Sequence, residues 1–166
     1  MKTAIYPGSF DPITLGHLNI ARRASLIFDR VVVVVMTNRE KTPLFTIPER
    51  IEMVRKVTDR FPNVTVATTD LLLAEYAKSY EDPVIVKGLR AVTDFEYEFQ
   101  IALINKKMNP NLETVFLTAC EKYTFLSSTA VKEMAVYGAD LGEFVPKEII
   151  EDVKEKTKNM RRQAQQ

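Results

Sequence analysis

Residues 6–17 have the sequence YPGSFDPITLGH, which predicts a strand, a tight turn and a helix in direct succession. The Pro/Gly pair ends the strand, and apolar residues recur at helical spacing after Thr14. The first N–H groups of a helix have no partner inside it, so they form an anion site, here beside Ser9, Thr14 and His17. The stretch therefore indicates chemistry on the phosphate of a nucleotide.

Apolar runs and helical patterns alternate along the rest of the chain. Residues 31–36 are six consecutive apolar residues, five of them valine, which is typical of a strand buried on both faces of a parallel sheet. Strands separated by helices favour βαβ units, so we expect an α/β fold with one domain over residues 1–166 and a five-stranded parallel sheet flanked by helices. The expected strands are 4–6, 31–36, 64–67, 83–86 and 114–118.

Local signals mark the expected helix ends. Thr46 with Glu49, and Thr93 with Glu96, have the spacing of capping boxes. Asp70 is expected to be the N-cap residue of a further helix. The expected helices are 14–28, one from Thr46 through Val57, one from Asp70 through Ala77, 93–108 ended by Pro110, 127–137 ended by Gly138, and one that begins at Pro146 and fades from Lys158.

Composition limits the possible partners and location of the chain. The net charge is +1, so a phosphate site must be a local cluster, and nucleic acid is not an expected partner. No apolar run approaches the ~20 residues that a membrane span needs, and Pro7 and Gly8 interrupt any signal segment, so we expect a cytoplasmic protein with no membrane partner. The one cysteine, Cys120, is expected in the core or a pocket. The polar, basic tail 154–166 is expected to be a solvated, partly frayed helix end.

Phosphate-binding side chains follow several of the expected strands. Ligands of open α/β sheets bind at the carboxyl ends of the strands, where Lys41, Lys87 and Arg90 would form a cationic rim. Gly88 would let the backbone approach a ligand closely. We expect His17 to be a neutral ring that donates one hydrogen bond to a phosphate oxygen, because the positive end of its helix disfavours the imidazolium.

Ser127, Ser128 and Thr129 start the helix that follows the last strand. They are interpreted either as plain N-capping groups or as a second phosphate cradle, and both interpretations stay open. The sequence has neither the P-loop nor the Gly-x-Gly-x-x-Gly motif, and it has no second histidine and no cysteine cluster, so zinc is not expected. The remaining mechanism is one in which the protein positions the reactants and stabilises the charge that develops on them.

Two pairs of motifs resemble known families. Thr14–His17 (TLGH) resembles the T/H-x-G-H motif of the nucleotidyltransferase superfamily, and Leu126–Lys132 (LSSTAVK) resembles its second motif. More narrowly, Tyr6–Thr14 (YPGSFDPIT) and Lys87–Glu98 (KGLRAVTDFEYE) resemble the phosphopantetheine adenylyltransferase family over nearly the whole chain. The resemblance implies a Rossmann-like nucleotidyltransferase fold.

The resemblance also implies a reaction and partners. The reaction transfers the adenylyl group of ATP to 4′-phosphopantetheine and gives 3′-dephospho-CoA and pyrophosphate, the penultimate step of coenzyme A biosynthesis. It implies Mg²⁺ bound through the ATP phosphates, coenzyme A as a feedback inhibitor, and a homohexamer. The aromatic helix that contains Phe95, Tyr97, Phe99 and Ile101 is a candidate subunit interface, with the floor of the pocket as the alternative role.

The resemblance assigns three catalytic residues and a set of binding residues. His17 would bind the α-phosphate and stabilise the transition state, Lys41 would hold the attacking phosphate, and Arg90 would contact the ATP phosphates. The implied acceptor-binding residues are Ser9, Lys41, Leu73, Lys87, Asn105 and Glu133. The implied ATP-binding residues are Ser9, Phe10, His17, Gly88, Leu89, Arg90, Glu98, Tyr123, Thr124, Phe125, Leu126, Ser127, Ser128 and Thr129.

Four positions differ from the common family pattern. Ser9 stands in place of threonine, Lys87 in place of arginine, and Tyr123 in place of a frequent tryptophan near the adenine. Lys132 stands in place of arginine, so no phosphate contact is assigned to it.

The sequence allows two other interpretations. An enzyme of the same superfamily that uses nicotinate mononucleotide or glycerol 3-phosphate is disfavoured by the stretch Lys87–Glu98. A non-catalytic nucleotide sensor or RNA-binding module would be supported by the basic tail and is disfavoured by His17, Lys41 and Arg90 together.

Overall fold

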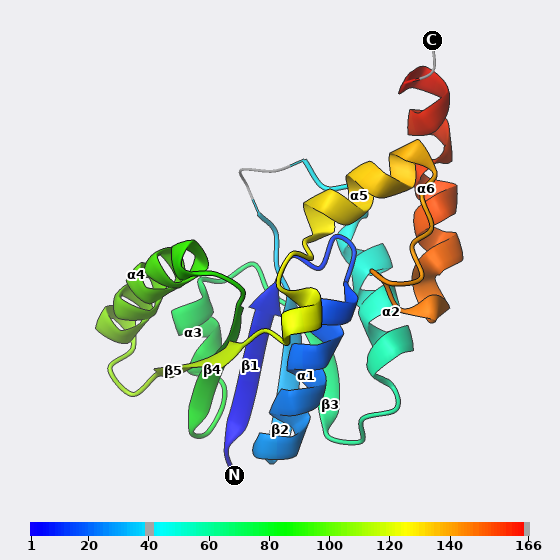
Figure 1. Ribbon diagram of the computed structural model, residues 1–166. Helices are drawn as coiled ribbons and strands as arrows, with labels where there is room; N and C mark the ends of the chain where they lie inside the picture. Colours follow the sequence, from blue (N-terminus) through cyan, green and yellow to red (C-terminus); the bar gives the residue numbers. More distant parts are fainter. Residues whose placement is uncertain (39–41, 165–166) are drawn as a thin grey trace.

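Five parallel strands form one sheet in the order β3-β2-β1-β4-β5 (Figure 1). The computed structural model describes residues 1–38 and 42–164. The α/β fold and all five predicted strands are confirmed, and β1 and β4 are longer than expected. The strands are β1 (Thr3–Gly8), β2 (Arg30–Val35), β3 (Val64–Thr68), β4 (Pro83–Leu89) and β5 (Glu113–Thr118).

The strand order reverses between β1 and β4. The chain first builds outward from β1 to β2 and β3, and then returns to the other side of β1 with β4 and β5. In sheets of this kind the loops at such a reversal separate and leave a crevice at the carboxyl ends of the strands. The turn after β1 and the end of β4 therefore meet at the place where a ligand is expected.

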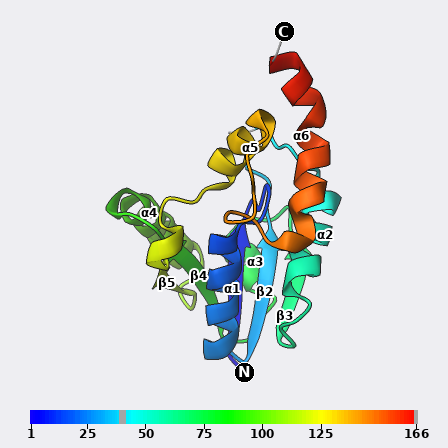
Figure 2. The same ribbon diagram turned by 45° about the vertical axis from the view of Figure 1, so that its right-hand side comes forward.

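Helices cover both faces of the sheet. In Figures 1 and 2, α5 lies beyond the carboxyl end of β1 and beside α6, with which it packs. Two 3₁₀ segments, η1 and η2, precede α5 and α6. The bounds are α1 (Leu15–Ile27), α2 (Ile47–Thr58), α3 (Leu73–Ala77), α4 (Val92–Met108), η1 (Glu121–Tyr123), α5 (Ser128–Tyr137), η2 (Lys147–Ile149) and α6 (Ile150–Ala164).

The valine run of β2 is buried on both faces, as expected. Alternate side chains of a strand point to opposite faces, and Val31, Val33 and Val35 pack into the cluster formed with α1 and α2. Val32 and Val34 pack into a second cluster that contains two alanines of α3. The helices on both faces therefore rest on a central strand that carries no polar side chain between positions 31 and 35.

Some helix ends follow the local signals and others do not. Thr46 and Glu49 form the expected capping box, and Gly138 ends α5 in the left-handed conformation with φ 78°. The prediction for Asp70 is wrong, because α3 begins only at Leu73 and its N-cap is Leu72. The second capping box is also wrong.

The position of Thr93 explains the second error. Helix α4 already begins at Val92, so Thr93 lies inside the helix and cannot be its N-cap. The carboxylate of Asp94 in the first turn instead accepts the backbone N–H of Arg90. The helix start is therefore accompanied by the Arg90–Asp94 contact, across four positions, and not by the predicted pair of Thr93 and Glu96.

The basic C-terminal segment continues as helix to Ala164, so it does not fade from Lys158 as expected. Lys156 forms an ion pair with Glu49 and thereby connects α6 to the start of α2. No helix in the described part of the chain is both long and apolar enough to cross a membrane. Cys120 is exposed at the start of η1, so it is not a core residue.

Candidate active site

The turn after β1 is held in an unusual conformation by Phe10. Its φ is 44°, in the left-handed region that bulky residues rarely adopt. The Phe10 ring is buried, contacts Gly8, and packs edge-on against the ring of His17 with 5.2 Å between the centroids. The side chain therefore supports His17, so any contact of Phe10 with ATP would come from its backbone.

His17 is part of the cap of α1. The Thr14 N–H donates to His17 Nδ1 over 3.1 Å, and the His17 N–H donates to Thr14 Oγ1 over 3.2 Å. Because Nδ1 accepts a backbone N–H, the proton of the neutral ring resides on Nε2. The ring thus has a hydrogen-bond donor on its other side, as a phosphate contact requires.

The surroundings of His17 keep its ring neutral. Burial, together with the positive charges of Arg90 and Lys87, lowers the pKa of His17 to about 4. The His17 ring therefore lies in a cationic environment and stays uncharged at neutral pH. Such a ring can donate to a phosphate oxygen but is a poor proton acceptor.

Two cations lie at the carboxyl end of β4, Lys87 inside the strand and Arg90 directly after it, and each has a carboxylate partner. Lys87 Nζ lies 3.0 Å from Glu98, and Arg90 Nε lies 3.1 Å from Asp94. Arg90 also donates to the backbone oxygen of Leu126 over 2.8 Å, which connects the end of β4 to the start of α5. Lys87 and Arg90, two of the three residues of the expected cationic rim, therefore lie at this edge, and each has a carboxylate partner.

Gly88 has a packing role. A Cβ atom at Gly88 would lie 2.8 Å from Ile20 Cγ1 on α1, so glycine allows β4 and α1 to approach closely. The backbone oxygen of neighbouring Leu89 accepts the N–H of Ala119 beyond β5. The end of β4 thus contacts α1 at Gly88 and the residue after β5 at Leu89.

The residues from Tyr123 to Leu126 line the approach to α5. Tyr123 is half-buried and lies against Gly16, in the first turn of α1. Phe125 is 66% exposed and meets Phe144 edge-on, whereas Leu126 is buried. Thr124 donates its hydroxyl to the backbone oxygen of Glu121 and stabilises the η1 turn.

The three hydroxyl residues at the start of α5 have different surroundings. Ser127 is the N-cap and accepts the N–H of Ala130, which confirms the capping interpretation for this residue. Ser128 donates its hydroxyl to the backbone oxygen of Pro12 over 2.7 Å. Thr129 is exposed.

The acceptor-binding residues implied by the resemblance are spread over several elements. Leu73 begins α3, and Asn105 is buried on α4 one turn before Asn109, whose amide donates to the Ala74 oxygen. The start of α3, which carries Leu73, therefore lies beside the end of α4, which carries Asn105. Glu133 is exposed on α5, and Lys41 lies outside the described residues.

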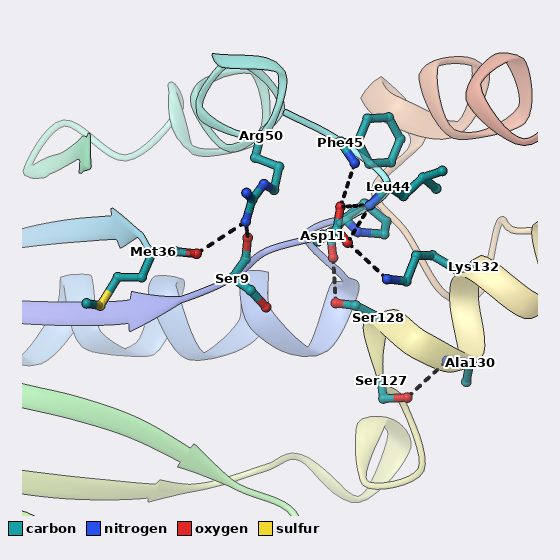
Figure 3. Close-up of polar contacts among 11 residues, drawn as sticks. Ser9, Asp11, Met36, Leu44, Phe45, Arg50, Ser127, Ser128, Ala130 and Lys132 are labelled. Atoms are coloured by element: carbon teal, nitrogen blue, oxygen red, sulfur yellow. Dashed lines mark hydrogen bonds and ion pairs between the residues drawn. The ribbon is translucent and has the colours of Figure 1, made fainter. Parts of the chain in front are cut away.

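Three charged residues near the site were not singled out as contacts by the sequence: Asp11, Arg50 and Lys132 (Figure 3). Asp11 accepts the backbone N–H groups of Leu44 and Phe45 and forms an ion pair with Lys132. Buried Arg50 donates to the backbone oxygens of Ser9 and Met36. Their partners lie 14 to 121 positions away, a separation at which the sequence carries no pattern.

Comparisons with known proteins agree with this geometry. Residues 5–134 match the Cytidylyltransferase-like family. A phosphopantetheine adenylyltransferase of Caldanaerobacter subterraneus subsp. tengcongensis is 54% identical over 95% of this chain and 99% of its own length. The enzyme of the same name from Clostridium botulinum strain Hall is 51% identical over 94% of this chain and 95% of its own.

A solved structure shares the fold at low identity. It is described as a candidate nicotinate-nucleotide adenylyltransferase from Vibrio parahaemolyticus, with a TM-score of 0.67, 19% identity, and coverage of 95% of this chain and 92% of that one. At this identity the likeness supports the fold alone. The curated relatives and the family match are closer, and from them the chain belongs to the phosphopantetheine adenylyltransferase family of nucleotidyltransferases.

Proposed function

We propose that the chain transfers the adenylyl group of ATP to 4′-phosphopantetheine and gives 3′-dephospho-CoA and pyrophosphate, the penultimate step of coenzyme A biosynthesis. The observation that carries the proposal is the neutral His17 ring at the start of α1, with Lys87 and Arg90 close enough to lower its pKa. A family relation at more than half identity supports the choice of acceptor.

The chemistry needs no general base. A phosphate monoester is largely ionised at pH 7, so the acceptor oxygen can attack the α-phosphorus of ATP directly. The new P–O bond forms as the bond from the α-phosphorus to the bridging oxygen breaks, and pyrophosphate leaves with that electron pair. The protein must position two anions and offset their repulsion.

The residues at the carboxyl ends of β1 and β4 fit this task. His17 Nε2–H would donate to an α-phosphate oxygen, where negative charge accumulates in the transition state. Arg90 would contact the ATP phosphates, and Lys87 would bind the acceptor phosphate. Lys41 would hold the attacking phosphate, as the family resemblance implies.

The carboxylates beside the cations would be displaced when the substrates bind. An incoming phosphate would take the place of Glu98 at Lys87 and of Asp94 at Arg90, so each cation exchanges one anion for another. Each cation therefore has a partner before the substrates arrive.

We place Mg²⁺ with the substrate. Among the described residues no group of three or more His, Cys, Asp or Glu side chains could hold a metal ion, so the ion would enter on the ATP phosphates and neutralise part of their charge. Removal of Mg²⁺ with a chelator should then abolish pyrophosphate release but leave the thermal unfolding midpoint unchanged.

We also propose a homohexamer in the cytoplasm that is inhibited by coenzyme A. Coenzyme A carries the same phosphopantetheine arm as the acceptor, so it would occupy the same subsite. The exposed apolar side chains of α4 support an assembly (Phe95, Tyr97, Phe99, Leu103 and Ile104). An enzyme that works on small soluble metabolites needs no membrane anchor.

The test is pyrophosphate release from ATP and Mg²⁺ with each candidate acceptor. Release with 4′-phosphopantetheine alone is expected. Release only with nicotinate mononucleotide or glycerol 3-phosphate would keep the superfamily and overturn the acceptor. ATP binding without release from any acceptor would favour a nucleotide sensor.

A further inference from the structure

The carboxylate of Asp11 joins three segments that are far apart in the sequence (Figure 3). Its side chain is only 7% exposed. It accepts the N–H of Leu44 at 2.9 Å, the N–H of Phe45 at 2.8 Å, and the ammonium group of Lys132 at 2.9 Å. Each donor comes from outside the loop that carries Asp11.

Two side chains of helix α5 bind this loop, at its consecutive residues Asp11 and Pro12. Ser128 and Lys132 are four positions apart, so they lie on the same face of α5. Ser128 donates to the backbone oxygen of Pro12, and Lys132 pairs with Asp11. The start of α5, with the implied ATP-binding residues before it, is thus held against the loop that leads to His17.

Hydrogen bonds hold both ends of the segment between β2 and α2 to the loop 9–12. At its beginning, Arg50 Nη1 donates to the oxygens of Met36 and Ser9, at 3.2 and 2.8 Å. At its end, Leu44 and Phe45 donate to Asp11.

We infer that Asp11 is a positioning residue for adenylyl transfer: its carboxylate fixes the Leu44–Phe45 segment and helix α5 in one arrangement around the loop 9–12, with Lys132 as its counter-charge. The inference rests on the proposed function, in which the residues before α5 bind ATP and Lys41, three positions before Leu44 in the sequence, holds the attacking phosphate. An enzyme that joins two anions depends on their alignment, and a displacement of about 1 Å can cost roughly 100-fold in rate.

The variants separate positioning from folding. Asp11→Asn keeps the shape but removes the charge, and its amide can no longer accept from all three donors. Lys132→Met removes the counter-charge from a side chain that is 24% exposed, and Lys132→Arg restores it. Asp152→Asn is the matched control, because it breaks an exposed ion pair between α6 and α2 with Lys56, away from the site.

Three measurements are made on each full-length variant. The kcat and KM values come from pyrophosphate release with ATP, Mg²⁺ and 4′-phosphopantetheine, and the Kd for ATP comes from calorimetry. Hydrogen exchange reports the protection of the Leu44 and Phe45 amides. A residue that only contributes to folding would lower the unfolding midpoint without changing kcat at 25 °C.

We expect Asp11→Asn to lower kcat by 10- to 100-fold, to leave the ATP Kd within threefold, and to lower the protection of the Leu44 amide, whose shorter hydrogen bond is to Oδ2. Lys132→Met should lower kcat about tenfold, and Lys132→Arg should restore it to within threefold. The double variant Asp11→Asn with Lys132→Met should lower kcat no more than the more impaired single variant does, because the two residues act as a unit. The kcat of Asp152→Asn should remain within twofold of the wild-type value.

Several results would overturn the inference. These are a folded Asp11→Asn variant with normal kcat, strictly additive losses, or a loss in ATP binding as large as the loss in kcat. If Asp11→Asn does not fold, normal kcat in Lys132→Met would overturn it equally. A wild-type chain that releases no pyrophosphate with any acceptor would overturn the proposed function and the positioning role together.

Discussion

Thr14 and His17 exchange hydrogen bonds across the first turn of α1, from the Thr14 N–H to Nδ1 and from the His17 N–H to Oγ1. The histidine occupies the position that glutamate or glutamine has in most capping boxes. One imidazole therefore completes the helix start through Nδ1 and leaves Nε2–H for a ligand. The helix cap and the proposed catalytic donor are therefore the same side chain.

The first prediction concerns the titration of His17. It is the only histidine in the chain, so its ring signals in a nuclear magnetic resonance titration need no assignment. We expect a pKa of about 4, because burial and the nearby cations disfavour the imidazolium. Replacing Lys87 or Arg90 by methionine should raise this pKa, and a wild-type value near 6.5 would contradict the buried, cationic environment.

The same shift has a consequence for stability. The unfolded chain binds a proton at His17 near pH 6.5, but the folded chain does so only near pH 4. The contribution of His17 to the free energy of unfolding should therefore fall as the pH decreases from 6.5 to 4, and should not change above pH 6.5. A His17→Gln variant should lack this part of the pH dependence.

The second prediction separates the two roles of His17. His17→Ala should lower kcat by about 10²–10³-fold, since loss of one charge-stabilising donor costs about 3–4 kcal/mol. Thr14→Val removes only the Oγ1 half of the cap and should cost about 1 kcal/mol of stability, with kcat nearly unchanged. If His17→Ala kept wild-type turnover, His17 would have only the capping role.

The third prediction tests the support of His17 by Phe10. A Cβ atom at Gly8 would lie 2.8 to 3.1 Å from three atoms of the buried Phe10 ring, which cannot move away without pressing on His17. Gly8→Ala should therefore destabilise the fold by about 1–3 kcal/mol and lower kcat.

The control for this substitution is Gly142→Ala. Gly142 is exposed, and its nearest contact would be the carboxylate of Asp140 at 3.4 Å, so the variant should be nearly neutral. Adding Phe10→Leu to Gly8→Ala should recover part of the stability, because leucine has no atoms at the far edge of the ring. Unfolding midpoints in urea measure all three variants, and an additive double variant would contradict the contact.

The fourth prediction concerns Lys87. If this residue binds the acceptor phosphate, Lys87→Met should raise the KM for 4′-phosphopantetheine by about 10- to 100-fold, which corresponds to the 1.5–3 kcal/mol of a charged hydrogen bond. The KM for ATP should change less. Lys87→Arg should remain active, because arginine keeps the charge and can still pair with Glu98. Equal losses for both substrates would instead indicate a structural role for the Lys87–Glu98 pair.

Local features of this chain could be predicted from the sequence where the physical cause is itself local. The Val31–Val35 run is a buried strand whatever surrounds it, and Thr46 and Glu49 cap a helix through contacts three residues apart. The error at Thr93 shows that a local pattern can still point to the wrong residue. The helix begins at Val92, and Asp94 in its first turn accepts the N–H of Arg90, only four positions away.

The candidate site was predictable only as a set of loops. The motifs place His17, Lys87 and Arg90 at strand ends, and the parallel sheet brings those ends together. The pairing of Asp11 with Lys132 spans 121 positions and joins two segments by tertiary folding alone. No spacing rule applies at that distance, so the residues that fix the site were visible only in three dimensions.

The last prediction concerns the assembly. Helix α4 has exposed apolar residues on several sides, and its Phe95 ring stacks on Phe99 and meets Phe116 of β5 edge-on. A single core face cannot bury all of them, so a second chain is the expected cover for this surface of α4 and β5. Tyr97 and Leu103 are the most exposed of the group, at 63% and 55%.

Leu103→Glu should therefore reduce the size of the assembly, because a charge buried against a second apolar surface is costly. Light scattering after gel filtration should give a mass near six times 19.0 kDa for the wild type and a smaller species for the variant. Leu26→Glu is the control, since Leu26 is exposed on α1, away from α4. A monomeric wild type would leave the apolar surface of α4 without a subunit role, whereas a hexamer that tolerates Leu103→Glu would place the interface elsewhere on the chain.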